Sequence, residues 1–148
     1  MGMMSKIIFL LLICLSSTGF AQNWQMIGQN PHYQISLNLD SIHATQREGQ
    51  NLLQVWSNWQ VYTEQGPRDE LRGDFTMVLY LINCQNDSIA ERSRTRYFGN
   101  GRERDSKATT WREPQVAPNY SIGASIVQRA CAVYTAPDLT SESLNAHI

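Results

Sequence analysis

Apolar and polar residues alternate along most of this chain, and a period of two residues is typical of half-buried β-strands. The alternation predicts strands at residues 32–39, 52–63, 75–84, 88–98 and 102–111. Polar turns separate these segments, and Gly99-Asn100-Gly101 supplies the left-handed positions of a hairpin. The connection 64–74 is long, charged and glycine-containing, so we expect an exposed loop there.

The segment 75–84 differs from the other predicted strands because both of its faces are apolar. One face carries Phe75, Met77, Leu79 and Leu81, and the other carries Val78, Tyr80, Ile82 and Cys84. An antiparallel strand usually meets water on one side, so this strand is predicted to be central and covered on both sides. The segment 102–111 has little apolar content and is predicted to lie at an edge.

The period changes to that of a helix after Pro114 and Pro118. Ser121 is suited to be the N-cap of a helix over 122–134. An apolar stripe at helical spacing comprises Ile122, Ile126, Val127, Ala130, Cys131 and Tyr134. Residues 136–148 follow without a strong pattern, and we expect a flexible tail.

The first 21 residues have the features of a secretory signal peptide. Lys6 supplies the positive charge, 7–14 is apolar, and Gly19-Phe20-Ala21 is a small-x-small cleavage site. The apolar run is about half of the ~20 residues that a membrane-spanning helix needs. A lipoprotein would be cut and acylated at Cys14, but Ile13 stands where that signal has a small residue, so we expect cleavage after Ala21 without lipidation.

Removal of the signal leaves two cysteines, Cys84 and Cys131. In an oxidising compartment an even pair predicts one disulfide, which would hold the helix against the face of the central strand that bears Val78, Tyr80 and Ile82. The opposite face would then need a second cover, from curvature of the sheet or from a second subunit. We therefore predict one α+β domain over 22–135: a single twisted antiparallel sheet of about five to six strands, packed against one C-terminal helix and closed by a disulfide.

Charge is unevenly distributed. The chain carries a net charge of −1, yet the segment 91–112 holds seven basic and three acidic residues. Arg92, Arg94 and Arg96 alternate on one predicted strand, so their guanidinium groups are expected to point the same way. With Arg102 and Arg104 after the turn, they form a candidate cationic patch for a sulfated polysaccharide or an acidic protein loop. The alternative is a solvated, arginine-rich edge that discourages aggregation.

Other residues give weaker signals. Trp56, Trp59 and Tyr62 suggest an aromatic platform for sugars, but the strand period places Trp56 and Trp59 on opposite faces, which favours a core role. His32 and His43 suggest haem ligation, although isolated histidines on separate elements are more often structural or exposed. Export and net acidity argue against nucleic acid as a partner.

The chain lacks the common catalytic motifs: HExxH, G-x-S-x-G, Cys-x-x-Cys and a glycine-rich phosphate loop. Carboxylate pairs such as Asp69-Glu70 fall in the charged loop, where we expect no desolvation to tune them. We therefore expect a protein that is not an enzyme and has no cofactor or metal site.

The order and spacing of several landmarks resemble the surface-adhesin protein E family of Gram-negative bacteria over most of 22–135. The landmarks are Trp24, Tyr33, Asp40-Ser41-Ile42, Gly49, Val55-Trp56, Cys84, Gly99 to Gly101, Trp111, Pro118, Ser121 and Cys131. The resemblance implies a small antiparallel β domain with one packed helix and a disulfide. It also implies dimers and binding to vitronectin, laminin, plasminogen and haemin. The binding loops of the family do not align clearly, so the resemblance assigns no ligand-binding residue here.

Two functional hypotheses follow. The first is a non-enzymatic, adhesin-like exported protein that engages host extracellular matrix or serum proteins through exposed loops and the arginine strand. The alternative is a periplasmic envelope protein that acts as a structural partner or as an inhibitor of a cell-wall-directed enzyme. The best-known member of the family is a lipoprotein, but Ile13 spoils that signal here, so the sequence is compatible with both the periplasm and the outer cell surface.

Overall fold

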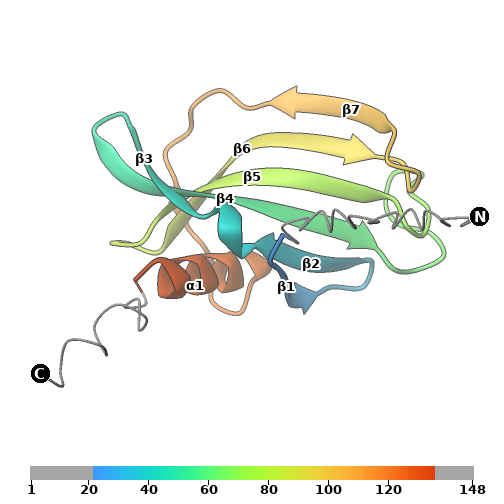
Figure 1. Cartoon of the computed structure of the whole chain (residues 1–148), viewed down its shortest axis with the longest axis horizontal. Helices are drawn as coiled ribbons and strands as arrows, with labels where there is room; N and C mark the ends of the chain where they lie inside the picture. Colours follow the sequence, from blue (N-terminus) through green and yellow to red (C-terminus); the bar gives the residue numbers. More distant parts are fainter. Residues whose placement is uncertain (1–21, 136–148) are drawn as a thin grey trace, which may run out of the picture.

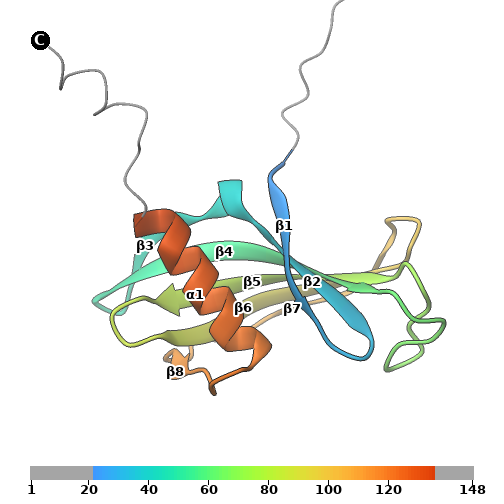
Figure 2. The same cartoon turned by 90° about the horizontal axis from the view of Figure 1, so that it is seen from below.

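The computed structural model describes residues 22–135, which form one antiparallel sheet with a single helix across one face (Figure 1, Figure 2). The elements are β1 (Trp24–Gln29), β2 (Tyr33–Asn38), the 3-10 helix η1 (Leu39–Ser41), β3 (His43–Arg47), β4 (Gln50–Val61), β5 (Phe75–Asn83), β6 (Ser88–Tyr97), β7 (Glu103–Ala108), β8 (Gln115–Val116) and α1 (Ile122–Thr135). The main strand order is β1-β2-β4-β5-β6-β7, with β3 paired to β4 and β8 paired to β6. The predicted signal peptide with Cys14, and the predicted flexible tail at 136–148, lie outside the described residues.

The predicted fold class is confirmed, but the predicted number of strands is wrong because the sheet has eight. Strands β2 and β3 pair with opposite ends of β4, and β7 and β8 pair with opposite ends of β6. Strands β1, β3 and β8 were not predicted. In β1, a register shift between Met26 and Gly28 interrupts the alternation, so the period of two cannot be followed along it.

Polar side chains explain the break between β2 and β3. The Asn38 side-chain oxygen accepts a hydrogen bond from the Asp40 backbone N–H at 3.1 Å and caps η1. The Ser41 hydroxyl donates to the Asn38 carbonyl at 2.7 Å and accepts from the Trp56 N–H at 2.9 Å. A serine side chain thus satisfies a β4 donor at the point where the neighbouring strand is interrupted.

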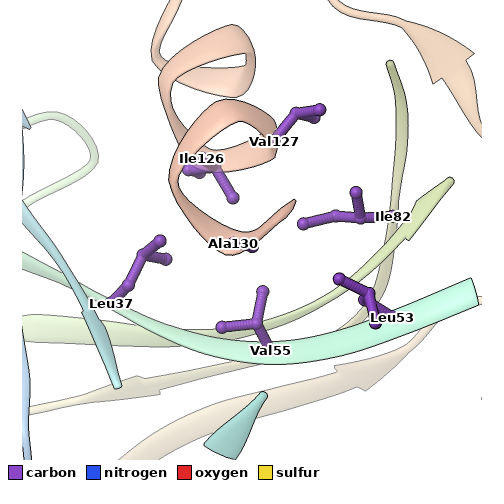
Figure 3. Close-up of a cluster of buried hydrophobic side chains, with 7 residues drawn as sticks. All are labelled: Leu37, Leu53, Val55, Ile82, Ile126, Val127 and Ala130. Carbon is purple, nitrogen blue, oxygen red and sulfur yellow. The ribbon is translucent and has the colours of Figure 1, made fainter. Parts of the chain in front are cut away.

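The helix begins where the sequence predicted, and it covers the predicted face of β5. The Ser121 hydroxyl accepts from the Ala124 N–H at 3.1 Å, which confirms the N-cap. The buried cluster between helix and sheet comprises Leu37, Leu53, Val55, Ile82, Ile126, Val127 and Ala130 (Figure 3). The Cys84–Cys131 disulfide is confirmed and borders this cluster, since both cysteines pack against it. Among residues 22–135, no helix combines the length and the apolar character needed to cross a membrane.

The sheet face opposite α1 is partly shielded within the single chain. Leu79 and Leu81 are 7% and 2% exposed, whereas Phe75 and Met77 are half-buried. The Arg47 guanidinium lies 5.6 Å from the centre of the Trp111 ring, and this contact joins the β3–β4 hairpin to the segment that follows β7. Burial of Leu79 and Leu81 therefore needs no second subunit.

The disulfide gives a direct test of how the helix is held. Cys84 and Cys131 are separated by 47 residues, and closing a loop of that length should stabilise the fold by about 4 kcal/mol. We expect the double variant Cys84→Ser/Cys131→Ser to lose roughly that free energy of unfolding, measured by guanidinium denaturation monitored by far-UV circular dichroism. An unchanged midpoint would show that core packing alone fixes α1.

Candidate functional site

The candidate arginines lie on and around β6, but they do not share one face of the sheet. In the β5–β6 pairing, Leu79 faces Ser93 and Tyr80 faces Glu91, so Arg92 is the extra residue of a β-bulge. Arg94 and Arg96 remain on the face that α1 packs against, which we call the helix-side face.

Arg92 turns to the opposite face of the sheet. Its Nη1 donates to Gln54 Oε1 at 3.2 Å, and Gln54 pairs with Leu81. The prediction that Arg92, Arg94 and Arg96 point the same way is therefore wrong for Arg92, because the bulge breaks the period of two.

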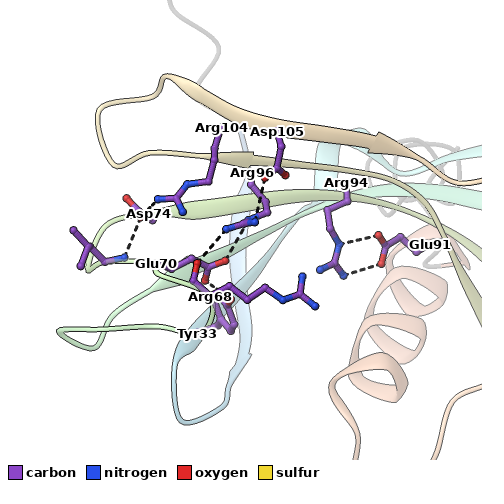
Figure 4. Close-up of polar contacts among 10 residues, drawn as sticks. Tyr33, Arg68, Glu70, Asp74, Glu91, Arg94, Arg96, Arg104 and Asp105 are labelled. Carbon is purple, nitrogen blue, oxygen red and sulfur yellow. Dashed lines mark hydrogen bonds and ion pairs between the residues drawn. The ribbon is translucent and has the colours of Figure 1, made fainter.

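Arg94 is held by a neighbouring carboxylate on its own strand (Figure 4). Its Nε and Nη2 donate to the two Glu91 side-chain oxygens at 2.8 and 2.9 Å. These hydrogen bonds raise the pKa of Arg94, which therefore stays charged. A two-point contact of this kind fixes the guanidinium plane, and Nη1 has no hydrogen-bond partner among the described residues.

Arg96 belongs to a network around the buried carboxylate of Glu70, which is only 6% exposed. Arg96 Nη1 donates to Asp105 Oδ2 at 3.1 Å, and its Nε lies 3.5 Å from Glu70 Oε1. The hydroxyl of Tyr33 donates to the other oxygen of Glu70 (Figure 4). Burial of Tyr33, together with this hydrogen bond and the charge of Glu70, raises the pKa of Tyr33 to about 12. Arg96 thus neutralises a buried charge that would otherwise destabilise the fold.

Arg104 performs the same task for a second buried carboxylate. Its Nη2 lies 3.4 Å from Asp74 Oδ2, while Asp74 Oδ1 accepts from the Gly99 N–H at 2.8 Å. A side chain at Gly99 would place a Cβ 3.3 Å from the Gly73 carbonyl carbon, so glycine permits this close approach. Arg102 and Arg104 also lie over the Phe98 ring, at 4.8 and 4.4 Å from its centre.

The connection 64–74 is therefore not simply exposed. Most of its residues are exposed, but Glu70 and Asp74 are each 6% exposed, so the expectation of a fully solvated loop is wrong for these two carboxylates. The sequence did contain a sign of these carboxylate–arginine pairs, namely a charged loop followed by an arginine-rich strand. Which acid pairs with which arginine depends on distant segments meeting at one end of the sheet.

Two adjoining clefts on the helix-side face share Arg68 and Arg94. The smaller has a volume of about 200 Å³ and is also lined by Tyr33, Trp59, Glu70, Thr76, Val78 and Arg96. The larger has a volume of about 480 Å³ and is also lined by Ile89, Glu91, Lys107, Arg112 and Glu113. Lys107 and Arg112 were counted in the basic segment 91–112, but neither they nor Arg68 were included among the candidate binding residues. They come from an edge strand, a connecting segment and a loop.

A third cleft has a different chemical character. It has a volume of about 650 Å³, lies between the β3–β4 hairpin and the end of α1, and is lined by no charged side chain. Leu52, Leu53, Ile82 and Tyr134 contribute most of its apolar character. It therefore offers an anion no charged side chain.

The other sequence signals do not converge on one site. Trp56 pairs with Leu79 and Trp59 pairs with Thr76, which confirms that the two tryptophans lie on opposite faces. His32 precedes β2 and His43 begins β3, and both are exposed. Among residues 22–135, no group of three or more histidine, cysteine or acidic side chains is arranged to hold a metal ion.

Comparison with known families gave one match. The model of a family described as "Surface-adhesin protein E" matches residues 24–132, which is well over half of the chain and agrees with the resemblance seen in the sequence. No curated protein and no solved structure matched the chain significantly. The matched range includes all eight strands, both cysteines and most of α1.

Tyr33 offers a test of the network around Glu70. Its pKa is raised from 10.0 in the folded state, so its contribution to stability is complete below pH 10 and is lost as the pH rises through about 12. We expect the variant Tyr33→Phe to lose this high-pH decline in unfolding free energy, and a spectrophotometric titration to lose one tyrosinate near pH 12. Loss of that tyrosinate signal near pH 10 would contradict the network.

Proposed function

We propose a binding function from one premise: this chain belongs to the surface-adhesin protein E family. Membership points to an adhesin-like, exported surface protein with a non-enzymatic role. Our proposal is that it engages host extracellular proteins of the vitronectin, laminin and plasminogen class. The observation that carries it is the extent of the family match, which covers the sheet, the disulfide and most of α1.

The contacts of the five candidate arginines suggest which of them meet a partner. Arg94, Arg96 and Arg104 already hold carboxylates, namely Glu91, Glu70 with Asp105, and Asp74. Within residues 22–135, Arg92 and Arg102 have no carboxylate within 4.0 Å. We therefore assign the direct contacts with acidic groups of a host protein to Arg92 and Arg102, and a supporting role to the other three.

Further parts of the proposal concern export and assembly. We place cleavage of the signal peptide after Ala21, without lipidation at Cys14. We include a homodimer, because Phe75 and Met77 stay half-buried on the face opposite α1. Haemin is left out, since His32 lies in the bend before β2 and His43 begins β3, and nothing in the described part of the chain brings the two histidines together.

The arginine assignment predicts a binding defect without a folding defect. Oxidised protein of residues 22–148 should bind immobilised laminin or vitronectin, and the double variant Arg92→Ala/Arg102→Ala should bind about tenfold more weakly, equivalent to ~1.4 kcal/mol. The matched control is Arg72→Ala/Arg129→Ala, which removes the same charge from exposed positions elsewhere. Equal weakening by the two variants, or no binding by the unmodified protein, would overturn the assignment.

Surface display makes a separate prediction. Treatment of intact cells with external protease should digest the protein, while a periplasmic protein in the same cells stays intact. Protection from the protease would confine the chain to the periplasm and would contradict an adhesin role. The alternative of a partner or inhibitor of a cell-wall-directed enzyme would then be the one to pursue, by assays of lysozyme or protease inhibition.

A further inference from the structure

The two clefts that share Arg68 and Arg94 bring together more positive charge than the chain neutralises there. We call them together the shared-arginine groove. Its cationic side chains are Arg68, Arg94, Arg96, Lys107 and Arg112, and its acidic side chains are Glu70, Glu91 and Glu113. Two of these acids already have partners within the chain: Glu70 contacts Tyr33 and Arg96, and Glu91 contacts Arg94. Within the described residues, Arg68, Lys107 and Arg112 have no carboxylate within 4.0 Å.

The pairing of β6 with β7 places two of these cations directly opposite each other. Arg94 is the register partner of Lys107, so both side chains leave the sheet on the helix-side face. Like charges at opposite positions on neighbouring strands repel each other and destabilise the pair. Arg68 lines both clefts at the same place, and Figure 4 shows its side chain extending from the 64–74 loop toward that of Arg94. An anionic group bound between the three cations would relieve this repulsion.

The smaller cleft adds an aromatic and apolar wall next to the cations. Tyr33 and Trp59 meet edge to face at 5.8 Å between ring centres, and Thr76 and Val78 line the same cleft. A volume of about 200 Å³ is below the roughly 300 Å³ at which ordinary ligand sites begin, so this cleft suits one ring of a longer molecule. The larger cleft adjoins it at Arg68 and Arg94, and would receive the neighbouring units.

We propose that the shared-arginine groove binds a linear sulfated polysaccharide. One sugar ring would lie against the Tyr33–Trp59 wall, and its sulfate groups would contact Arg68, Arg94 and Lys107. Guanidinium groups match the geometry of such oxyanions, and an aromatic wall suits the apolar face of a sugar ring. This site is independent of the host-protein contacts assigned above to Arg92 and Arg102.

The position of the groove argues against an acidic peptide as its occupant. Peptides that bind sheets with useful affinity often add a strand to an exposed edge, where backbone hydrogen bonds are available. The shared-arginine groove lies on a sheet face and is lined by charged and aromatic side chains, rather than along a free strand edge. The chain's net charge of −1 also provides no general attraction for polyanions, so binding should depend on these local groups and weaken with salt.

Titration of a heparin oligosaccharide into oxidised protein of residues 22–148, followed by calorimetry, tests the proposal. We expect saturable binding that weakens with added salt. The double variant Arg68→Ala/Lys107→Ala removes two exposed side chains with no ion-pair partner in the described region, so the fold should be kept, as thermal melting would check. Its affinity should fall at least about tenfold, while the charge-matched Arg72→Ala/Arg129→Ala should bind within about twofold of the unmodified protein.

Competing probes separate the other occupants. Hyaluronan, which carries carboxylates but no sulfate, and poly-glutamate should both bind much more weakly than heparin. Absence of heparin binding, equal binding of poly-glutamate, or equal losses in the two double variants would each overturn the proposal. A third variant, Arg112→Ala, keeps the test valid if Arg68→Ala/Lys107→Ala does not fold, because it lies outside the paired strands and should also weaken heparin binding.

The variant Arg92→Ala/Arg102→Ala distinguishes this proposal from the proposed host-protein function. It should retain heparin binding, since Arg92 contacts Gln54 and neither arginine lines the shared-arginine groove. Heparin binding without laminin or vitronectin binding would overturn only the host-protein assignment. The opposite result would overturn only the polysaccharide site.

Discussion

The Cys84–Cys131 bond is the constraint on which the rest of the domain depends. It ties the C-terminal part of α1 to the chain immediately after β5, the strand that lies between β4 and β6. Ala130 is completely buried beside it, so the helix backbone approaches the sheet closely at this point. With α1 fixed over one end of the helix-side face, the other end remains open, and the clefts lined by Arg68 and Arg94 form there.

At that open end, the buried groups include carboxylates paired with arginines, whereas the buried cluster under α1 is hydrophobic. Glu70 and Asp74 come from the 64–74 connection, and Arg96 and Arg104 come from the β6–β7 hairpin. Each pair costs desolvation free energy, so hydrogen bonds from Tyr33 and from the Gly99 N–H are needed to complete them. These pairs hold the connection against the sheet and so position Arg68 beside Arg94.

The arginine-rich strand therefore serves two purposes. Arg96 and Arg104 neutralise buried acids and hold the loops in place, whereas Arg92 and Arg102 have no acidic partner in the described part of the chain. Under the function proposed above, this division lets Arg92 and Arg102 meet a partner while Arg96 and Arg104 keep the loops in place. The chain belongs to the surface-adhesin protein E family, and this membership suggests a binding function for the arrangement.

The sequence by itself determined the α+β class, the central strand, the N-cap at Ser121 and the disulfide, because hydrophobic period, capping and cysteine pairing are local or countable features. It did not determine the bulge at Arg92 or the eight-strand count, since both depend on how neighbouring strands pair. It likewise gave no sign of Arg68 beside Arg94. That meeting joins a loop to a strand far along the chain, and only tertiary packing around the buried carboxylate of Glu70 brings them together.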